Sequence, residues 1–277
     1  MAFLNNLILA CQHCTPGAPP EMNASTSDVA NFVQSRNGDY GTKTSKAGLL
    51  STLPAGELAI LQPKLEFVRL RIHQVLHEAG STMKSAYFVE RGLLSLITVQ
   101  SNGKGVEVGL VGSGGFAGLP LVDGFTTIPN RIMAQTEGTA HRIDAGALRE
   151  LLPRCPNLEL GLHRFGQQLM VQVMQIAACN ALHEVEQRLA RWLLMSYDLL
   201  GSKELPLTQD ILGQLLGTRR SSVTVAAGSL QRGGMIACAR GSITILDEIK
   251  LQHAACDCYL LIKQRLESWT SERQVAA

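Results

Sequence analysis

The spacing of apolar residues is most regular in the segment 207–246, near the C-terminal end of the chain. Five apolar residues recur at three- and four-residue intervals, which predicts a short amphipathic helix: Leu207, Ile211, Leu212, Leu215 and Leu216. Thr208 is a candidate N-cap of that helix. Gly217 supplies a tight turn from which a second helix can leave at a steep angle.

The second helix of this segment has two distinct faces. Its predicted buried stripe consists of Val223, Ala226, Ala227 and Leu230, and its predicted outer face of Arg220, Ser221, Thr224, Val225 and Gly228. Gly233 and Gly234 end the helix. Two short apolar strands, 235–239 and 243–246, then form a wing around 240–242. A helix, a turn, a helix and a wing together are the shape that places a second helix in the major groove of DNA.

The first half of the chain shows a different pattern. Between Val68 and Ala147, short alternating segments are separated by turns that contain glycine, and examples are 87–89, 94–98, 106–111 and 131–135. Strands of this length and spacing predict a small antiparallel barrel or jelly roll. Residues 49–70 are predicted to form a helical lead-in, and residues 145–153 a short helix that prolines end.

A long helical pattern then runs from about Leu158 to Leu200. Its apolar stripe repeats at spacings of three and four: Leu162, Phe165, Leu169, Val173, Ile176 and Asn180. We expect a second copy to cover this stripe as a dimer seam, with Asn180 and His183 setting the register. The alternative is a helix packed on its own barrel. Four later residues are predicted to form a solvated, self-paired face: Glu184, Glu186, Arg188 and Arg191.

These elements predict an α+β fold with an N-terminal β jelly-roll barrel, a long dimerisation helix and a C-terminal winged helix-turn-helix. The predicted division is a flexible arm over 1–46, the barrel over 47–157 and the dimerisation helix over 158–202. The DNA-binding domain with a C-terminal helical tail occupies 203–277, and residues 203–206 form the hinge into it.

Length and charge add to this picture. A chain of 277 residues suits two domains. The net charge is only +2, yet residues 206–246 carry four arginines against Asp210 alone, so the positive charge is concentrated in the predicted reading unit. No run approaches 18 apolar residues, so no conventional transmembrane helix and no membrane partner are expected. A cytoplasmic location is expected because a DNA-binding protein has no use outside the cell. The chain also has no nucleophile elbow, phosphate loop or paired catalytic carboxylates, so no catalytic residue is assigned and an enzyme is excluded.

Several stretches resemble the Crp/Fnr family of bacterial transcription regulators. They are GTRRSSV at 217–223, GSITILD at 241–247 and YFVERGLLSLIT at 87–98, and the resemblance covers about residues 48–250. AACNALHEVEQRLARWLL at 177–194 is similar to one branch of the family that is frequent in soil and root-nodule bacteria. The resemblance implies a homodimeric regulator with a cyclic-nucleotide-binding-like sensor barrel over 47–157. Its implied partners are palindromic double-stranded DNA, RNA polymerase and a small-molecule effector.

The resemblance also implies which residues contact DNA. They are Thr208, Gln209, Arg219, Arg220, Ser221, Ser222, Thr224, Val225 and Arg240. Arg220 aligns with the guanine-reading arginine of the family, and Arg219 is expected to contact phosphate. Better-studied members carry Glu and Arg where this chain has Ser221 and Val225, so we expect a different half-site here.

The sensor loop departs from the family pattern for cyclic AMP. In members that bind this ligand, a Glu in a Gly-rich loop holds the ribose and an Arg followed by Ser or Thr holds the phosphate. Here Gly118 takes the Glu position, and Arg131 is followed by Ile132. Cyclic AMP is therefore not the expected effector, and neither effector nor cofactor can be named. The candidate effector pocket consists of Gly115, Phe116, Gly118, Leu119 and Arg131.

Seven cysteines leave a competing hypothesis open. A redox- or metal-responsive module could use the pair Cys11 and Cys14, or the pair Cys256 and Cys258, with DNA binding secondary. Cys155, Cys179 and Cys238 lie among apolar residues and are interpreted as small core side chains. The seven histidines show no metal-binding spacing, so the sequence assigns no metal ligand.

Overall fold

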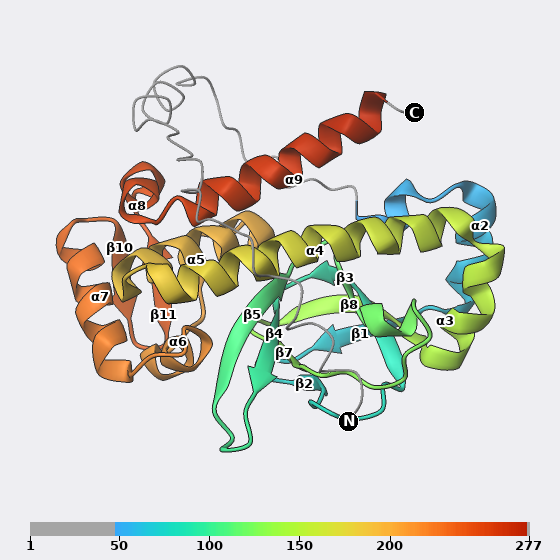
Figure 1. The fold of residues 1–277 in the computed structure, drawn as a ribbon, viewed down its shortest axis with the longest axis horizontal. Helices are drawn as coiled ribbons and strands as arrows, with labels where there is room; N and C mark the ends of the chain where they lie inside the picture. Colours follow the sequence, from blue (N-terminus) through green and yellow to red (C-terminus); the bar gives the residue numbers. More distant parts are fainter. Residues whose placement is uncertain (1–47, 276–277) are drawn as a thin grey trace, which may run out of the picture. The chain divides into compact units, whose positions relative to one another are not determined.

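The computed structural model describes residues 48–275 (Figure 1). The predicted arm over 1–46, together with Cys11 and Cys14, lies outside these residues. Within the described part, no helix combines the length and the apolar character that crossing a membrane requires.

The N-terminal part is a sandwich of two antiparallel four-stranded sheets, as the alternating pattern predicts. One sheet has the order β1-β8-β3-β6, made of Glu66–Leu70, Gly138–Asp144, Ser85–Arg91 and Phe116–Ala117. The other has the order β2-β7-β4-β5, made of Val75–His77, Arg131–Ala134, Leu94–Val99 and Gly105–Val111. A short 3-10 turn, η3 (Leu119–Leu121), follows β6. Alternate residues of β3, such as Ala86 and Phe88, enter the core between the sheets.

The lead-in to the barrel is only partly helical. It consists of η1 (Leu49–Thr52), α2 (Ala55–Leu61) and η2 (Gln62–Lys64). The prediction of a helix up to Leu70 is wrong, because Glu66–Leu70 is strand β1. This segment pairs along its whole length with β8, with Glu66 opposite Arg142 and Leu70 opposite Gly138. The sheet therefore satisfies backbone groups that a helix would have satisfied internally.

The predicted helix over 158–200 is two helices. After α3 (Ala145–Leu151) and η4 (Leu152–Arg154), α4 runs over Pro156–Leu182 and α5 over Val185–Leu200. His183 is extended, and Glu184 caps α5 in a reciprocal pair with Gln187. This capping box provides a new helix start, which explains the break inside an otherwise helical pattern.

Four of the six stripe residues of α4 pack inside the same chain, while Val173 and Asn180 are half-buried. Leu162 is part of the barrel core, and Phe165 and Leu169 pack against it. Ile176 is buried in a second core, which α5 shares with the C-terminal domain. These side chains are not free to form a seam with a second copy. For them the alternative interpretation, a helix packed on its own barrel, is the correct one. Figure 1 shows α4 lying over the barrel strands.

The predicted solvated face of α5 is wrong for its two arginines. Arg188 and Arg191 are buried, together with most of the helix from Leu189 to Tyr197. The Nη2 group of Arg188 donates to the carbonyl oxygen of Leu216 in the C-terminal domain. Helix α5 is therefore an internal element between the barrel and that domain, and its charges do not face solvent.

The C-terminal domain has the predicted helix-turn-helix and wing. Its elements are α6 (Gln209–Leu215), α7 (Arg220–Arg232), β10 (Ile236–Ala239) and β11 (Ser242–Ile245). The expected hinge contributes a third strand, β9 (Glu204–Leu205), which pairs with β11. Two helices follow the wing, α8 (Glu248–Ala254) and α9 (Cys258–Val275), and α9 packs against α4.

Candidate DNA-binding interface and sensor barrel

The turn between α6 and α7 has the geometry that the sequence predicts. The Thr208 hydroxyl accepts a hydrogen bond from the Ile211 amide at 3.3 Å and caps α6. Gly217 has a φ of +59°, and a Cβ at this position would lie 2.2 Å from Cγ2 of Val106. Glycine is therefore required here both by the backbone conformation and by the close approach of β5.

Helix α7 divides into a buried and an exposed face along the predicted lines. Its buried residues are Val223, Ala226, Ala227 and Leu230, and its exposed residues at the N-terminal end include Arg220, Ser221, Thr224 and Val225. The side chain of Val225 is 71% exposed, which is unusual for a β-branched apolar residue on a helix with an available core. An apolar group held in solvent beside arginine and hydroxyl groups suits contact with base edges and thymine methyl groups.

Two polar contacts organise this exposed face. Arg220 Nη1 lies 3.3 Å from Asp210 Oδ2, and both side chains are mostly exposed. Such a pair contributes little free energy, so the guanidinium can exchange Asp210 for a base. The Thr224 hydroxyl donates to Gln209 Oε1 at 2.7 Å, which connects the start of α6 to α7.

The other predicted DNA contacts flank this group. Arg219 is the exposed N-cap of α7, Ser222 is half-buried, and Arg240 is exposed in the turn of the wing. Gly241 beside it has a φ of +84°. The structure therefore gives every predicted DNA-contacting residue some solvent exposure, at the helix ends and the wing.

A cleft of about 1320 Å³ separates the start of α7 from the β4–β5 hairpin of the barrel. Its lining includes Gln100, Lys104 and Arg131 from the barrel and Asp210, Arg219 and Arg220 from the C-terminal domain. The arginines that we expect to contact DNA therefore also face the sensor barrel.

The candidate effector-pocket residues come from two regions of the barrel. Gly118 has a φ of +131°, and a Cβ there would lie 2.6 Å from Cβ of Ala86, so no larger side chain fits. Phe116 is buried in the barrel core against Phe88, with the ring centroids 4.8 Å apart. Arg131 lies in the other sheet, where its Nε donates to Glu78 Oε2 at 2.9 Å. It lines the cleft, which Gly115 and Leu119 do not.

A buried carboxyl group that the sequence analysis missed joins the barrel to α5. Glu107 of β5 accepts a hydrogen bond from Trp192 Nε1 at 2.6 Å and another from the Ser95 hydroxyl. Burial raises the pKa of Glu107 to about 7, although both hydrogen bonds and the charge of Arg191 act in the opposite direction. The sequence analysis did not identify Glu107 because a single Glu in an alternating strand normally faces solvent.

Comparisons with known proteins identify both halves of the chain. A family model for the cyclic nucleotide-binding domain matches residues 67–155, and one for the Crp-like helix-turn-helix domain matches residues 187–254. The comparison with curated proteins gives no match.

Three solved structures are similar to the described fold. A transcriptional regulator of the crp/fnr family from Eubacterium rectale has 18% identity and a TM-score of 0.60, covering 74% of this chain and 96% of that chain. The c-di-GMP responsive global regulator CLP from Xanthomonas campestris has 18% identity and a TM-score of 0.59, covering 69% and 99%. FixK2 from Bradyrhizobium japonicum has 14% identity and a TM-score of 0.60, covering 69% and 98%.

At these identities the structural likeness concerns the fold, while the two family models concern the sequence itself. Together the models match more than half of the chain, in the order sensor domain and then DNA-binding domain. The chain therefore belongs to the Crp/Fnr family of transcription regulators.

Proposed function

We propose that the protein acts as a homodimer that binds a palindromic site in double-stranded DNA through α7. The observation that carries this proposal is the exposed N-terminal face of α7, where Arg220, Ser221, Thr224 and Val225 stand free of the core. Two such helices in a symmetric dimer would reach two half-sites one helical turn apart. We further propose that it works in the cytoplasm, contacts RNA polymerase and catalyses no reaction.

Arg220 is the proposed base reader and Arg219 the proposed phosphate contact. Arg220→Ala should weaken binding to the best site by about 1–3 kcal/mol and relax one base-pair position. Arg219→Ala should weaken binding to all sequences and flatten the dependence of affinity on salt. Binding is measured by fluorescence anisotropy on a DNA site selected from genomic fragments, at several salt concentrations.

The matched control is Arg69→Ala, which removes an exposed arginine from β1 of the barrel and should leave DNA binding unchanged. Retention of no specific fragment by the wild-type protein at physiological salt would refute the proposed DNA recognition. Equal effects of the Arg219 and Arg220 variants on specificity would refute the division of roles between them.

The preferred DNA sequence should differ from the TGTGA-type half-site of the family. Ser221 is a short and permissive hydrogen-bonding residue, and exposed Val225 offers only an apolar contact. Two charged base contacts that better-studied members make are therefore missing in each half-site. Selection from a random duplex library should return a palindrome that is richer in A·T at those positions, and recovery of TGTGA as the leading motif would contradict this assignment.

The dimer seam is proposed on the face of α4 that the barrel leaves uncovered. Met170 is 52% exposed and Met174 is 58% exposed on successive turns of this helix. The neighbouring small residues Ala177, Ala178 and Ala181 are also exposed, so a second α4 could approach closely. Met174→Asp should therefore yield monomers in light scattering and weaken DNA binding, while a dimer that persists in this variant would place the seam elsewhere.

We propose that the effector is not a cyclic nucleotide held in the manner of the family. The close approach of Gly118 to Ala86 supports this proposal, because it leaves no room for a ribose-binding glutamate at this position. Ile132 follows Arg131, so the hydroxyl that accompanies the phosphate-binding arginine of the family is also missing. Isothermal titration with cyclic AMP and cyclic GMP should give no binding at millimolar nucleotide. Cyclic di-GMP is included in the titration because the structurally similar CLP is responsive to it. Micromolar binding of cyclic AMP would overturn the proposal.

A further inference from the structure

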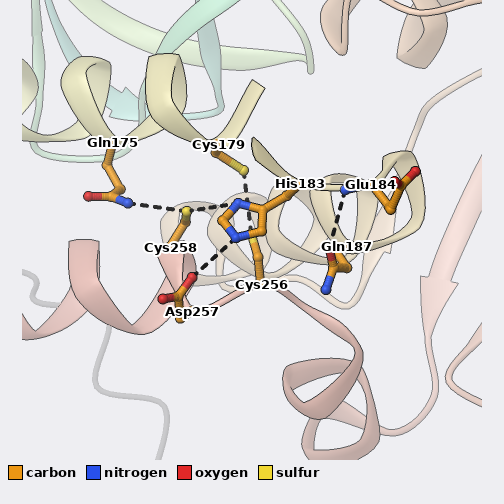
Figure 2. Close-up of polar contacts among 8 residues, drawn as sticks. All are labelled: Gln175, Cys179, His183, Glu184, Gln187, Cys256, Asp257 and Cys258. Atoms are coloured by element: carbon orange, nitrogen blue, oxygen red, sulfur yellow. Dashed lines mark hydrogen bonds and ion pairs between the residues drawn. The ribbon is translucent and has the colours of Figure 1, made fainter. Parts of the chain in front are cut away.

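Three cysteines and one histidine from opposite ends of the C-terminal half meet in one buried cluster (Figure 2). Cys179 lies on the last turn of α4, and His183 is the residue that caps this helix. Cys256 and Cys258 lie where the chain passes from α8 into α9. One ligand atom from each residue lies within 4.8 Å of all the others, and the three cysteines are buried.

The spacing of the ligand atoms suits a single tetrahedral ion. Cys179 Sγ lies 3.4 Å from Cys256 Sγ, and Cys258 Sγ lies 3.5 Å from His183 Nδ1. A zinc–sulfur distance of about 2.3 Å places two sulfurs of a tetrahedron about 3.8 Å apart, close to the observed separations. In a [4Fe–4S] cluster each protein ligand binds a different iron atom, and in a [2Fe–2S] cluster the four ligands are divided between two iron atoms, so some ligand atoms lie much farther apart than those observed here. The geometry therefore favours one ion over a cluster.

The residues around the cluster orient its ligands. His183 directs Nδ1 to the cysteines, while its Nε2 lies 3.5 Å from Asp257 Oδ1 (Figure 2). A carboxylate on the far nitrogen is the usual second partner of a metal-bound histidine, because it fixes the tautomer and the ring orientation. Gln175 Nε2 donates to Cys258 Sγ at 3.1 Å, as amide groups commonly do to metal-bound sulfur.

Two buried arginines lie beside the cluster, and their positive charge would be stabilised by a negatively charged partner. Arg191 is 2% exposed, and its Nε has no hydrogen-bond partner among the described residues. Arg188 is 8% exposed and its Nε also has no hydrogen-bond partner among the described residues, and both guanidinium groups interact electrostatically with Cys179. Buried unpaired charges are costly. Three thiolates around one divalent ion carry a net charge of −1, which would compensate one of the two neighbouring guanidinium charges.

We propose that Cys179, His183, Cys256 and Cys258 bind one Zn²⁺ ion in a closed structural site. Three thiolates and one imidazole are a common ligand set of structural zinc, and such a site leaves no position for water or substrate. Binding displaces the three thiol protons, and the metal keeps its oxidation state. The ion would tie the end of α4, which lies on the sensor barrel, to the segment that follows the wing. Cys179 is then a ligand and not only a small core residue.

The test begins with the full-length protein, purified under reducing conditions and without added metal. Elemental analysis should find one zinc per chain. Exchange for Co²⁺ should give visible absorption bands of a tetrahedral site together with sulfur-to-cobalt charge transfer in the near ultraviolet. Wild-type protein that carries no zinc, takes up no Co²⁺ and shows a disulfide between Cys179 and Cys256 in mass spectrometry would overturn the proposal.

Matched variants locate the site within the chain. Cys179→Ser and Cys258→Ser should lose the zinc and the charge-transfer band. Cys155→Ser, at a cysteine buried in the barrel core, should keep both. The double variant Cys11→Ser/Cys14→Ser should also keep both, because its C-x2-C pair is not part of the proposed site. Zinc lost from that double variant and retained by Cys258→Ser would overturn the assignment.

A milder variant keeps the test valid where a ligand variant fails to fold. Asp257→Asn removes the carboxylate beside His183 from an exposed side chain without touching a ligand. Competition against a chromophoric chelator should show zinc bound about 10–100-fold more weakly in this variant than in the wild type. The cobalt spectrum should keep its tetrahedral form. An unchanged zinc affinity would show that His183 is not a ligand positioned by Asp257.

Discussion

The buried carboxyl group of Glu107 should make the stability of the protein depend on pH. Its two hydrogen bonds join β5 of the sensor barrel to Trp192 of α5, and Trp192 belongs to the core that includes the DNA-binding helices. Burial raises the pKa of this group from 4.5 to about 7, against the opposing effects of Ser95, Trp192 and the charge of Arg191. The folded protein therefore keeps a proton on Glu107 at pH values where the unfolded chain has lost it.

The sign and size of the effect follow from linkage. Between pH 4.5 and about 7 the folded state binds more protons than the unfolded state, so the free energy of unfolding falls as pH rises. A rise of about 2.5 pKa units corresponds to about 3 kcal/mol, all of which is lost above pH 8. Glu107→Gln is neutral at every pH and preserves both contacts. Its carbonyl can accept from Trp192, and its amide can donate to the Ser95 hydroxyl.

Chemical denaturation monitored by tryptophan fluorescence at pH 5, 6, 7 and 8 measures this difference. The free energy of unfolding of Glu107→Gln should exceed that of the wild type by less than about 1 kcal/mol at pH 5 and by about 3 kcal/mol at pH 8. Glu137→Gln, an exposed glutamate just before β8, is the control and should follow the wild type throughout. A difference between Glu107→Gln and the wild type that stays constant from pH 5 to pH 8 would refute the reasoning.

Three further changes test other parts of the fold. Gly217→Ala should lower the free energy of unfolding by more than about 1 kcal/mol in thermal denaturation, because φ is +59° and the new Cβ meets Val106. Glu57→Gln should cost about 1–2 kcal/mol at pH 7, since the Glu57 carboxylate accepts hydrogen bonds from Asn157 and from the Leu158 amide at the start of α4. Burial opposes these hydrogen bonds, but they prevail and lower the pKa of Glu57, so this cost should disappear as pH falls through that pKa. Ile176→Asp should unfold the chain and not merely dissociate a dimer, as circular dichroism would show, because Ile176 is buried in the core of its own chain.

The DNA-binding unit was predictable from the sequence because the features that define it are set by residues close to one another along the chain. The buried stripe of α7, the turn at Gly217 and the glycines that end α7 depend on residues within a few positions of one another. The short strands of the barrel were predictable for the same reason. Strand β9 was missed, because two residues carry no periodicity and only their pairing with β11 makes them a strand.

The faces of α4 and α5 were harder to predict because the pattern shows that a face is buried but not what buries it. The stripe that includes Leu162 and Ile176 is buried as expected, but by the chain's own barrel and C-terminal domain. For Arg188 and Arg191 the prediction failed in the opposite direction, because they were expected to face solvent and are buried. Arginines at helical spacing are usually solvated, yet these lie between two domains and beside the cysteine cluster.

The cluster of three cysteines and His183 could not be predicted from the sequence alone. Cys179 and His183 are four residues apart and share one side of the end of α4, while Cys256 and Cys258 flank Asp257 at the start of α9. Each pair alone supplies only two ligands, which is too few to hold zinc firmly. The packing of α9 on α4 brings the pairs together, and that contact is set by the tertiary fold. If the site binds zinc, the ion stabilises the same packing that forms it, so metal content and the attachment of α9 should be lost together when a chelator removes the ion.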